Sequence, residues 1–170
     1  MRMILVGLCV LTTACGSQAL NSPTSPTAAT IASAATAVTG DDVPFKGSLT
    51  ASEVDIVTFP TLLADGAAEG TATHLGRYTA EFNATVNVLD GTATGSYTFT
   101  AANGDRLLST FTGLGVPAGG TMASITETLT ITGGTGRFAG AGGSLVVRRA
   151  LDQATGESSG EIEGSISMPH

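Results

Sequence analysis

The sequence predicts an all-β domain that closes into an antiparallel barrel after an export signal and a disordered tether. Apolar and polar residues alternate with a period of two along residues 43–168, turn signals recur at short spacing, and no amphipathic helix pattern interrupts them. Alternation indicates strands with one covered face, as in a barrel or a sandwich. Gly47, Gly76 and Gly164 favour the barrel, because closure requires sharply bent strands.

Residues 1–15 are typical of a bacterial export signal. Arg2 precedes an apolar run that is shorter than the roughly 20 residues needed to span a bilayer. The residues before Cys15 are similar to a lipobox, in which the cysteine is diacylated, although Thr12 stands where leucine is usual. We expect a lipid anchor on Cys15 in the cell envelope, with the outer membrane as the default because Gly16 follows. A free Cys15 thiol after cleavage, or plain secretion, remains the alternative.

Residues 16–42 have the composition of a tether. They are built mainly from Ser, Thr, Ala and Pro, and the repeated Ser-Pro-Thr at 22–24 and 25–27 disfavours a helix. The globular domain is therefore expected to span residues 43–170, which is enough chain to bury a core. Both cysteines lie before this domain, so no disulfide can form within it.

The charge balance excludes some partners. The chain has 14 acidic and seven basic residues, and one of the basic residues, Arg2, belongs to the export signal. An acidic surface repels nucleic acid and anionic lipid, so neither is expected as a partner. No cofactor is expected either.

The expected strands follow one another between clear turn signals. Asp90-Gly91 ends the longest alternating run, and Asn103-Gly104 favours a type I′ hairpin because both residues accept a positive φ. Seven or eight strands are predicted in total. The clearest cover residues 43–51, 74–88, 96–101, 107–115, 122–132, 143–151 and 160–168.

The glycine-rich segment from Thr132 to Ala139 matches the pattern TGxxGxxA of dinucleotide-binding enzymes. That site requires a buried parallel strand before the loop and a helix after it. Here the preceding strand alternates, and further glycines follow where the helix should be, each costing about 1 kcal/mol relative to alanine in a helix. The segment is therefore interpreted as a turn with a short helical piece at 137–139, in which Phe138 plugs one end of the barrel.

Four stretches of the chain have a recognisable pattern: THLGRYTAEF at 73–82, FTAANGDRL at 99–107, TITGGTGRFAGAGG at 130–143 and TGESSGEIEGSIS at 155–167. Together they resemble bacterial relatives of the allene oxide cyclase and dirigent superfamily. The resemblance covers roughly residues 70–168. It implies an eight-stranded, calycin-like barrel. Plant members with a similar fold rearrange a fatty-acid epoxide or steer phenoxy-radical coupling, but their pocket residues cannot be placed on this chain motif by motif.

Glu127 is the main candidate for chemistry inside the barrel. It has the same parity as its apolar neighbours on the predicted strand, so it is expected to point inwards, where burial would raise its pKa. Arg148 and Arg149 are adjacent, so one of them must also point inwards. The sequence leaves open which one, and it also leaves open a purely structural ion pair or a bulge that turns Glu127 outwards.

Three polar residues near the start of the longest predicted strand are weaker candidates. His74, Arg77 and Glu81 lie on one predicted strand but not on one face, which favours an outward polar row over a catalytic site. No metal site is expected, because the chain has two histidines and no HxH or HExxH spacing. The candidate pocket lining consists of the inward aromatic residues, Tyr78, Phe82, Tyr97, Phe99 and Phe111.

The sequence favours a non-catalytic protein that binds a small apolar ligand or acts through its surface, since the domain shows no recognisable catalytic set. An isomerase or cyclase that polarises an oxygenated substrate with Glu127 and an arginine is the alternative. A purely structural envelope protein with a filled core is the third possibility. Pocket volume distinguishes the third possibility from the other two.

Overall fold

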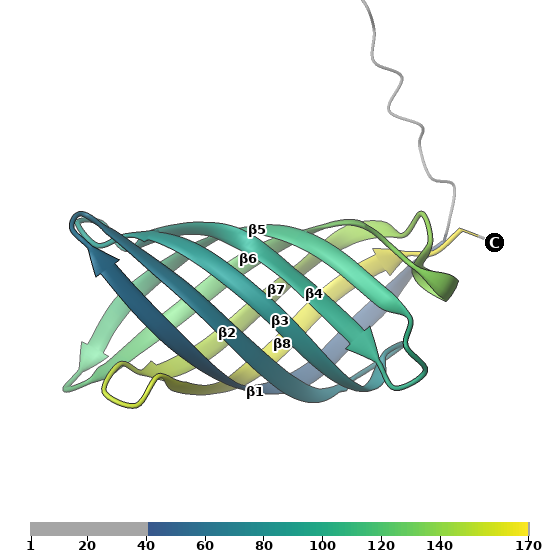
Figure 1. The fold of residues 1–170 in the computed structure, drawn as a ribbon. Helices are drawn as coiled ribbons and strands as arrows, with labels where there is room; N and C mark the ends of the chain where they lie inside the picture. Colours follow the sequence, from purple (N-terminus) through teal and green to yellow (C-terminus); the bar gives the residue numbers. More distant parts are fainter. Residues whose placement is uncertain (1–40, 170) are drawn as a thin grey trace, which may run out of the picture. The chain divides into compact units, whose positions relative to one another are not determined.

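The computed structural model describes residues 41–169, which form one closed antiparallel barrel (Figure 1). Strand order around the barrel follows the chain, from β1 to β8, and β8 pairs with β1 to close it. The predicted all-β barrel is therefore confirmed. The strands are β1 (Asp42–Thr58), β2 (Thr61–Ala72), β3 (Gly76–Asn87), β4 (Thr92–Ala101), β5 (Arg106–Gly119), β6 (Met122–Gly134), β7 (Gly142–Asp152) and β8 (Glu157–Ser167).

Alternation along each strand decides which side chains fill the interior. On β6, for example, Ala123, Glu127, Leu129 and Ile131 are buried, while the threonines between them are exposed. The same pattern recurs on the other strands because successive side chains of a strand point to opposite faces. The outer surface of the barrel is consequently rich in Thr, Ser and charged residues.

Strand β2 is the element that the sequence pattern does not single out. After Leu62, its inward positions are all Ala or Gly, which have low strand propensity. The structure shows why small residues are needed there: a Cβ on Gly66 would collide with the ring of Phe82 on the paired strand β3. Likewise, a Cβ on Gly70 would meet the Ser48 carbonyl oxygen and approach the Tyr78 hydroxyl.

One end of the barrel is plugged by the glycine-rich segment between β6 and β7. A single 3-10 turn, η1 (Gly136–Phe138), carries Phe138 into the core, where it is fully buried. Gly136 has φ of 57°, in the left-handed region that favours glycine. Antiparallel strands flank this segment and no long helix follows it, so the turn interpretation is confirmed and the dinucleotide interpretation is excluded.

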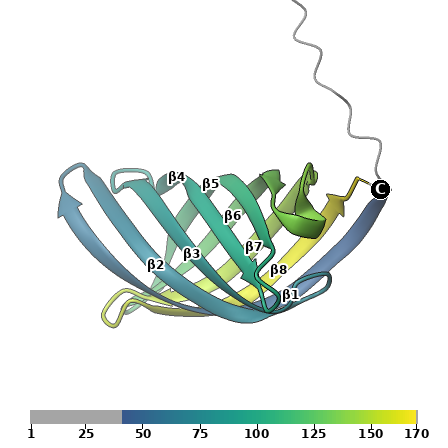
Figure 2. The same cartoon turned by 45° about the vertical axis from the view of Figure 1, so that its right-hand side comes forward.

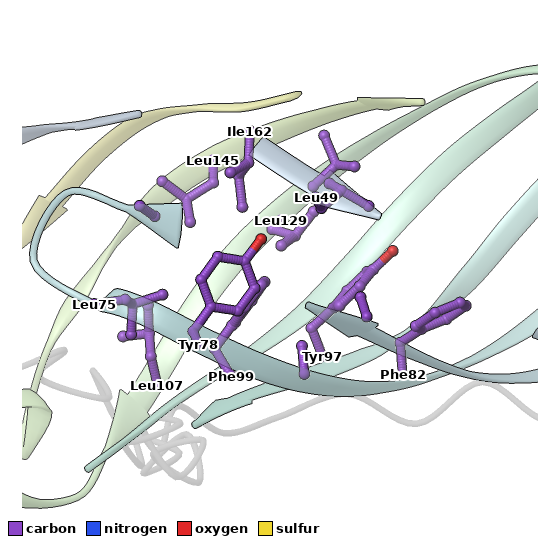
Figure 3. Close-up of a cluster of buried hydrophobic side chains, with 14 of the residues drawn as sticks. Leu49, Leu75, Tyr78, Phe82, Tyr97, Phe99, Leu107, Leu129, Leu145 and Ile162 are labelled. Carbon is purple, nitrogen blue, oxygen red and sulfur yellow. The ribbon is translucent and has the colours of Figure 1, made fainter. Parts of the chain in front are cut away.

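The middle of the barrel is filled by aromatic and aliphatic side chains (Figure 3). The Tyr97 ring stacks between Phe82 and Phe99, and its centroid lies 5.1 Å from that of Phe82 and 5.4 Å from that of Phe99. Tyr78 contacts Phe99 edge to face. Aliphatic side chains face these rings across the interior, namely Leu49, Leu129, Leu145 and Ile162 (Figure 3).

The opposite end carries the hairpins β1–β2, β3–β4, β5–β6 and β7–β8, and we call it the mouth (Figure 2). Strand β1 begins at the plugged end and β8 finishes there, so the chain enters and leaves the barrel far from the mouth. Within residues 41–169, no helix is long and apolar enough to cross a membrane. The predicted export signal at 1–15, the lipid on Cys15 and the tether up to residue 40 lie outside the described residues.

Replacing Gly66 with Ala tests the close packing of β2 on β3. The added methyl group would displace the Phe82 ring, and we expect a loss of about 1–3 kcal/mol in the free energy of unfolding, typical of overpacking. Chemical denaturation measures this loss. The neighbouring substitution Ala67→Ser, on the exposed outer face, should change stability by less than about 0.5 kcal/mol. Equal stability of the two variants would contradict the packing argument.

Candidate functional site

Glu127 lies inside the barrel, as its parity on β6 predicts, and only 1% of its surface is exposed. On the neighbouring strand β7, the inward residues are Leu145, Val147, Arg149 and Leu151. Of the two candidate arginines, Arg149 therefore points inwards, and Arg148 points outwards. Arg148 pairs with Glu163 of β8 on the outer surface, with 2.6 Å between Nη1 and Oε1.

Arg149 bridges two buried carboxyl groups. Its Nη1 lies 2.6 Å from Oε2 of Glu53 and 3.1 Å from Oγ of Ser158, and its Nη2 lies 3.3 Å from Oε1 of Glu127. The three charged side chains are each at least 95% buried. We call this arrangement the Glu53–Arg149–Glu127 cluster. Such a cluster is held together by charge-assisted hydrogen bonds that water cannot replace.

Two aromatic side chains complete the surroundings of the cluster. Tyr97 donates its hydroxyl hydrogen to Oε2 of Glu127 over 2.7 Å. The guanidinium carbon of Arg149 lies 5.2 Å from the centre of the Phe82 ring, within cation–π range. Burial, followed by the charge of Glu127, raises the pKa of Tyr97 well above its usual value, so this hydroxyl remains a neutral donor.

Glu53 is the member of the cluster that the sequence reasoning missed. The alternation of inward and outward residues that begins at Val43 could have predicted its position. If the alternation is continued beyond Ala51, it places Glu53 and Asp55 on the inner face of β1. Burial raises the pKa of Glu53, although the charge of Arg149 opposes this shift. Burial also raises the pKa of Asp55, which lies nearer the mouth.

The opposing effects on Arg149 favour its charged form. Burial by itself would lower the pKa of the guanidinium, but the charge of Glu127, together with Tyr97 and Glu53, outweighs it and holds the pKa above its usual value. Arg149 is therefore a permanent cation. Chemically, the cluster supplies a fixed charge pattern and the Tyr97 hydroxyl at the centre of the barrel.

A cavity of about 570 Å³ connects the cluster with the mouth. Glu53, Glu127 and Arg149 form its polar floor, and Asp55 and Asp90 lie towards its opening. Its walls are mostly apolar, formed by Leu62, Ala64, Ala84, Val86, Val88, Leu89, Ala93, Leu114, Val116, Ala123, Ile125 and Leu151. A volume of this size lies within the range of sites that bind small molecules.

The aromatic residues expected to line a pocket occupy a different place. Tyr78, Phe82, Tyr97, Phe99 and Phe111 are buried in the filled middle of the barrel and do not belong to the cavity wall. Their rings pack against one another and leave no gap for a ligand. The cavity begins beyond them, where the inward positions change to alanine and short aliphatic residues.

The other candidate residues lie away from this site. His74 belongs to the β2–β3 turn, where its Nε2 is 3.1 Å from the Pro44 carbonyl oxygen, and Arg77 and Glu81 are exposed on the outer face of β3. Among residues 41–169, no group of three or more His, Cys, Asp or Glu side chains is placed to hold a metal ion.

Comparison with known proteins gives no match among protein-family models, curated proteins or solved structures. The resemblance to the allene oxide cyclase and dirigent superfamily therefore stays a prediction from the sequence.

Replacing Arg149 with Met tests the Glu53–Arg149–Glu127 cluster. The substitution leaves two buried carboxylates without a counter-charge, and we expect the free energy of unfolding to fall by about 3–5 kcal/mol. Arg148→Met, the same change on the outer face of the same strand, should cost no more than about 1 kcal/mol because its ion pair is exposed. Urea denaturation of both variants measures the difference. Similar losses in the two variants would contradict the assignment of Arg149 as the buried partner.

The raised pKa of Glu53 makes stability depend on pH. A carboxyl group whose pKa is higher in the folded than in the unfolded protein holds its proton more tightly when folded. The free energy of unfolding, relative to that of Glu53→Gln, should therefore decrease as the pH rises above the ordinary value of 4.5 and level off once Glu53 has ionised. Urea denaturation between pH 4 and 7 measures this difference. An increase with pH over this window would contradict the prediction.

Proposed function

We propose that this protein binds one small, largely apolar molecule in the cavity at the mouth of its barrel. The observation that carries the proposal is the cavity itself: about 570 Å³ of space with apolar walls and a polar floor formed by the Glu53–Arg149–Glu127 cluster. Apolar walls supply affinity by removing ligand surface from water, and a few fixed polar groups orient the ligand.

The filling of the barrel supports a preformed site. Side chains plug one end and pack the middle, and the residues facing the cavity are too small to reach across it. A barrel that served only as a filled structural element would not need a buried cluster of charges on the floor of an open cavity. A second hollow, of about 940 Å³, is lined by residues of β1–β3 and β6–β8, but by no member of this cluster.

The predicted export and lipid anchor complement this proposal. Because β1 begins at the plugged end, a tether attached there would leave the mouth free to receive a ligand. We therefore propose an exported, envelope-bound binding protein. Its membrane contact would be the N-terminal lipid on Cys15, and the barrel would carry the binding site.

A second candidate function is the isomerisation or cyclisation of an oxygenated ligand. The observation that favours it is the position of Glu127, which lines the cavity and is hydrogen-bonded to Tyr97 and Arg149. Such a reaction would leave the mass of the ligand unchanged. Chromatography of the ligand before and after incubation with the protein distinguishes binding from conversion. If the protein is an isomerase or cyclase, Glu127→Gln should abolish the conversion.

The substitution Ala84→Phe tests binding. Ala84 lies on the cavity wall, so the added ring would occupy the space of a ligand. Native mass spectrometry of the purified protein should show a bound mass of a few hundred daltons, and N-phenyl-1-naphthylamine, a neutral apolar dye, should fluoresce on binding. We expect Ala84→Phe to weaken dye binding at least about tenfold, equivalent to the loss of roughly 1.4 kcal/mol of apolar contact.

The matched control is Ala67→Phe, which adds the same ring to the exposed outer face of β2. This variant should bind the dye as the unchanged protein does. Absence of any bound mass, together with equal dye fluorescence in both variants, would contradict the proposed site.

A further inference from the structure

The charges that line the cavity are strongly unbalanced. Four carboxyl groups line it, those of Glu53, Asp55, Asp90 and Glu127, and they face a single guanidinium, that of Arg149. Arg149 is already engaged, because both of its terminal nitrogens bond to oxygen atoms of the protein. The cavity therefore has an excess of negative charge that its own walls do not neutralise.

The other basic side chains of the described barrel lie too far away to correct this imbalance. Lys46, Arg77, Arg106 and Arg137 lie near the plugged end, on the first residues of β1, β3 and β5 and in the β6–β7 segment. Arg148 is on the outer surface and is paired with Glu163. These basic side chains therefore do not balance the carboxylates at the mouth.

The mouth is also apolar. Most exposed large apolar side chains of the described residues gather on three of its hairpins, and only Leu108 lies elsewhere. We call this set the apolar rim. It comprises Val54, Ile56, Val57, Phe59 and Leu63 on β1–β2, Val88 and Leu89 on β3–β4, and Leu114, Val116 and Met122 on β5–β6. Apolar side chains that gather in exposed positions are consistent with a surface that contacts a ligand or partner.

We propose that the ligand of this cavity is a small cationic amphiphile, an apolar molecule that carries a protonated amine or another organic ammonium group. This inference rests on the proposed binding function and adds the charge class of the ligand. The ammonium group would lie between the floor and Asp55, and the apolar body would contact the walls, which include four residues of the apolar rim, Val88, Leu89, Leu114 and Val116.

Charge complementarity favours a cation over the other classes of small molecule. A neutral ligand would displace water from Asp55 without bringing an opposite charge. An anion would add to the negative charge, and both terminal nitrogens of Arg149 already bond to carboxylates of the protein. Burial raises the pKa values of Glu53 and Asp55 although the charge of Arg149 opposes the shift, so the guanidinium does not fully offset the burial of these carboxylates.

The test compares three probes that share a ten-carbon chain and differ in charge: decylammonium, 1-decanol and decanoate. Each is titrated against the protein and N-phenyl-1-naphthylamine at pH 7, and its dissociation constant is obtained from displacement of the dye. We expect decylammonium to bind at least about tenfold more tightly than 1-decanol, and decanoate to bind most weakly.

Two matched variants locate the source of the preference. Asp55→Asn removes a carboxylate that lines the cavity but does not belong to the Glu53–Arg149–Glu127 cluster, so the fold should be retained. It should reduce the preference for decylammonium several-fold. Asp65→Asn removes the same charge from the outer face of β2, opposite Val54, and should leave the preference unchanged.

The outcomes separate the two proposals. If decylammonium and 1-decanol bind equally, or if decanoate binds best, the cationic class is wrong while the binding site stands. If none of the probes displaces the dye, and Ala84→Phe does not alter dye fluorescence, the binding site itself is wrong. An equal effect of Asp55→Asn and Asp65→Asn would show that only the overall charge of the protein attracts the amine, and would also overturn the inference.

Discussion

Burial of Arg149 between Glu53 and Glu127 is the constraint on which the interior of this barrel depends. A guanidinium inside a protein requires counter-charges at hydrogen-bonding distance, and here they come from β1 and β6 on either side of β7 and β8. Glu53 reaches Arg149 across β8 because the inward residues there are small: Ser158 bonds to the guanidinium, and Gly160 lies directly opposite Arg149 in the β7–β8 register. The cluster therefore joins the two ends of the sheet where the barrel closes.

The size of the inward side chains divides the barrel into a filled half and an open half. Towards the plugged end, aromatic rings of β3 and β4 fill the space left by glycines and alanines of β2. Towards the mouth, alanines such as Ala64 and Ala84 face one another across paired strands, and no large side chain fills the space in front of them. The Glu53–Arg149–Glu127 cluster lies at the boundary between the filled half and the open half. Its charges are therefore covered by the aromatic rings on one side and line the cavity on the other.

Retaining such a cluster has a cost in stability. Replacement of buried ion pairs by apolar residues is often neutral or stabilising in other proteins, so stability alone does not explain why one is kept. A fixed arrangement of charges beside an open cavity can instead orient a ligand. The apolar rim adds to this argument, because exposed apolar surface at the mouth is unfavourable in water unless a partner covers it.

The sequence by itself determined the all-β class, the inward parity of Glu127 and the turn at Gly136, because these depend on a period of two and on glycine conformations that are local properties. It did not reveal β2, whose Gly and Ala residues make sense only beside Phe82 and Tyr78. It left Arg148 and Arg149 equivalent, since Val146 and Val147 are equally apolar. Only the pairing of β7 with β6 and β8 decided between them.

Closure of the barrel also decided the site. Glu53 and Arg149 are 96 residues apart in sequence, and only the pairing of β1 with β8 brings them together. The cavity is likewise a tertiary property, because it depends on the summed volume of inward side chains from many strands. A pattern of apolar and polar residues predicts which side chains point inwards, but it does not predict whether they meet.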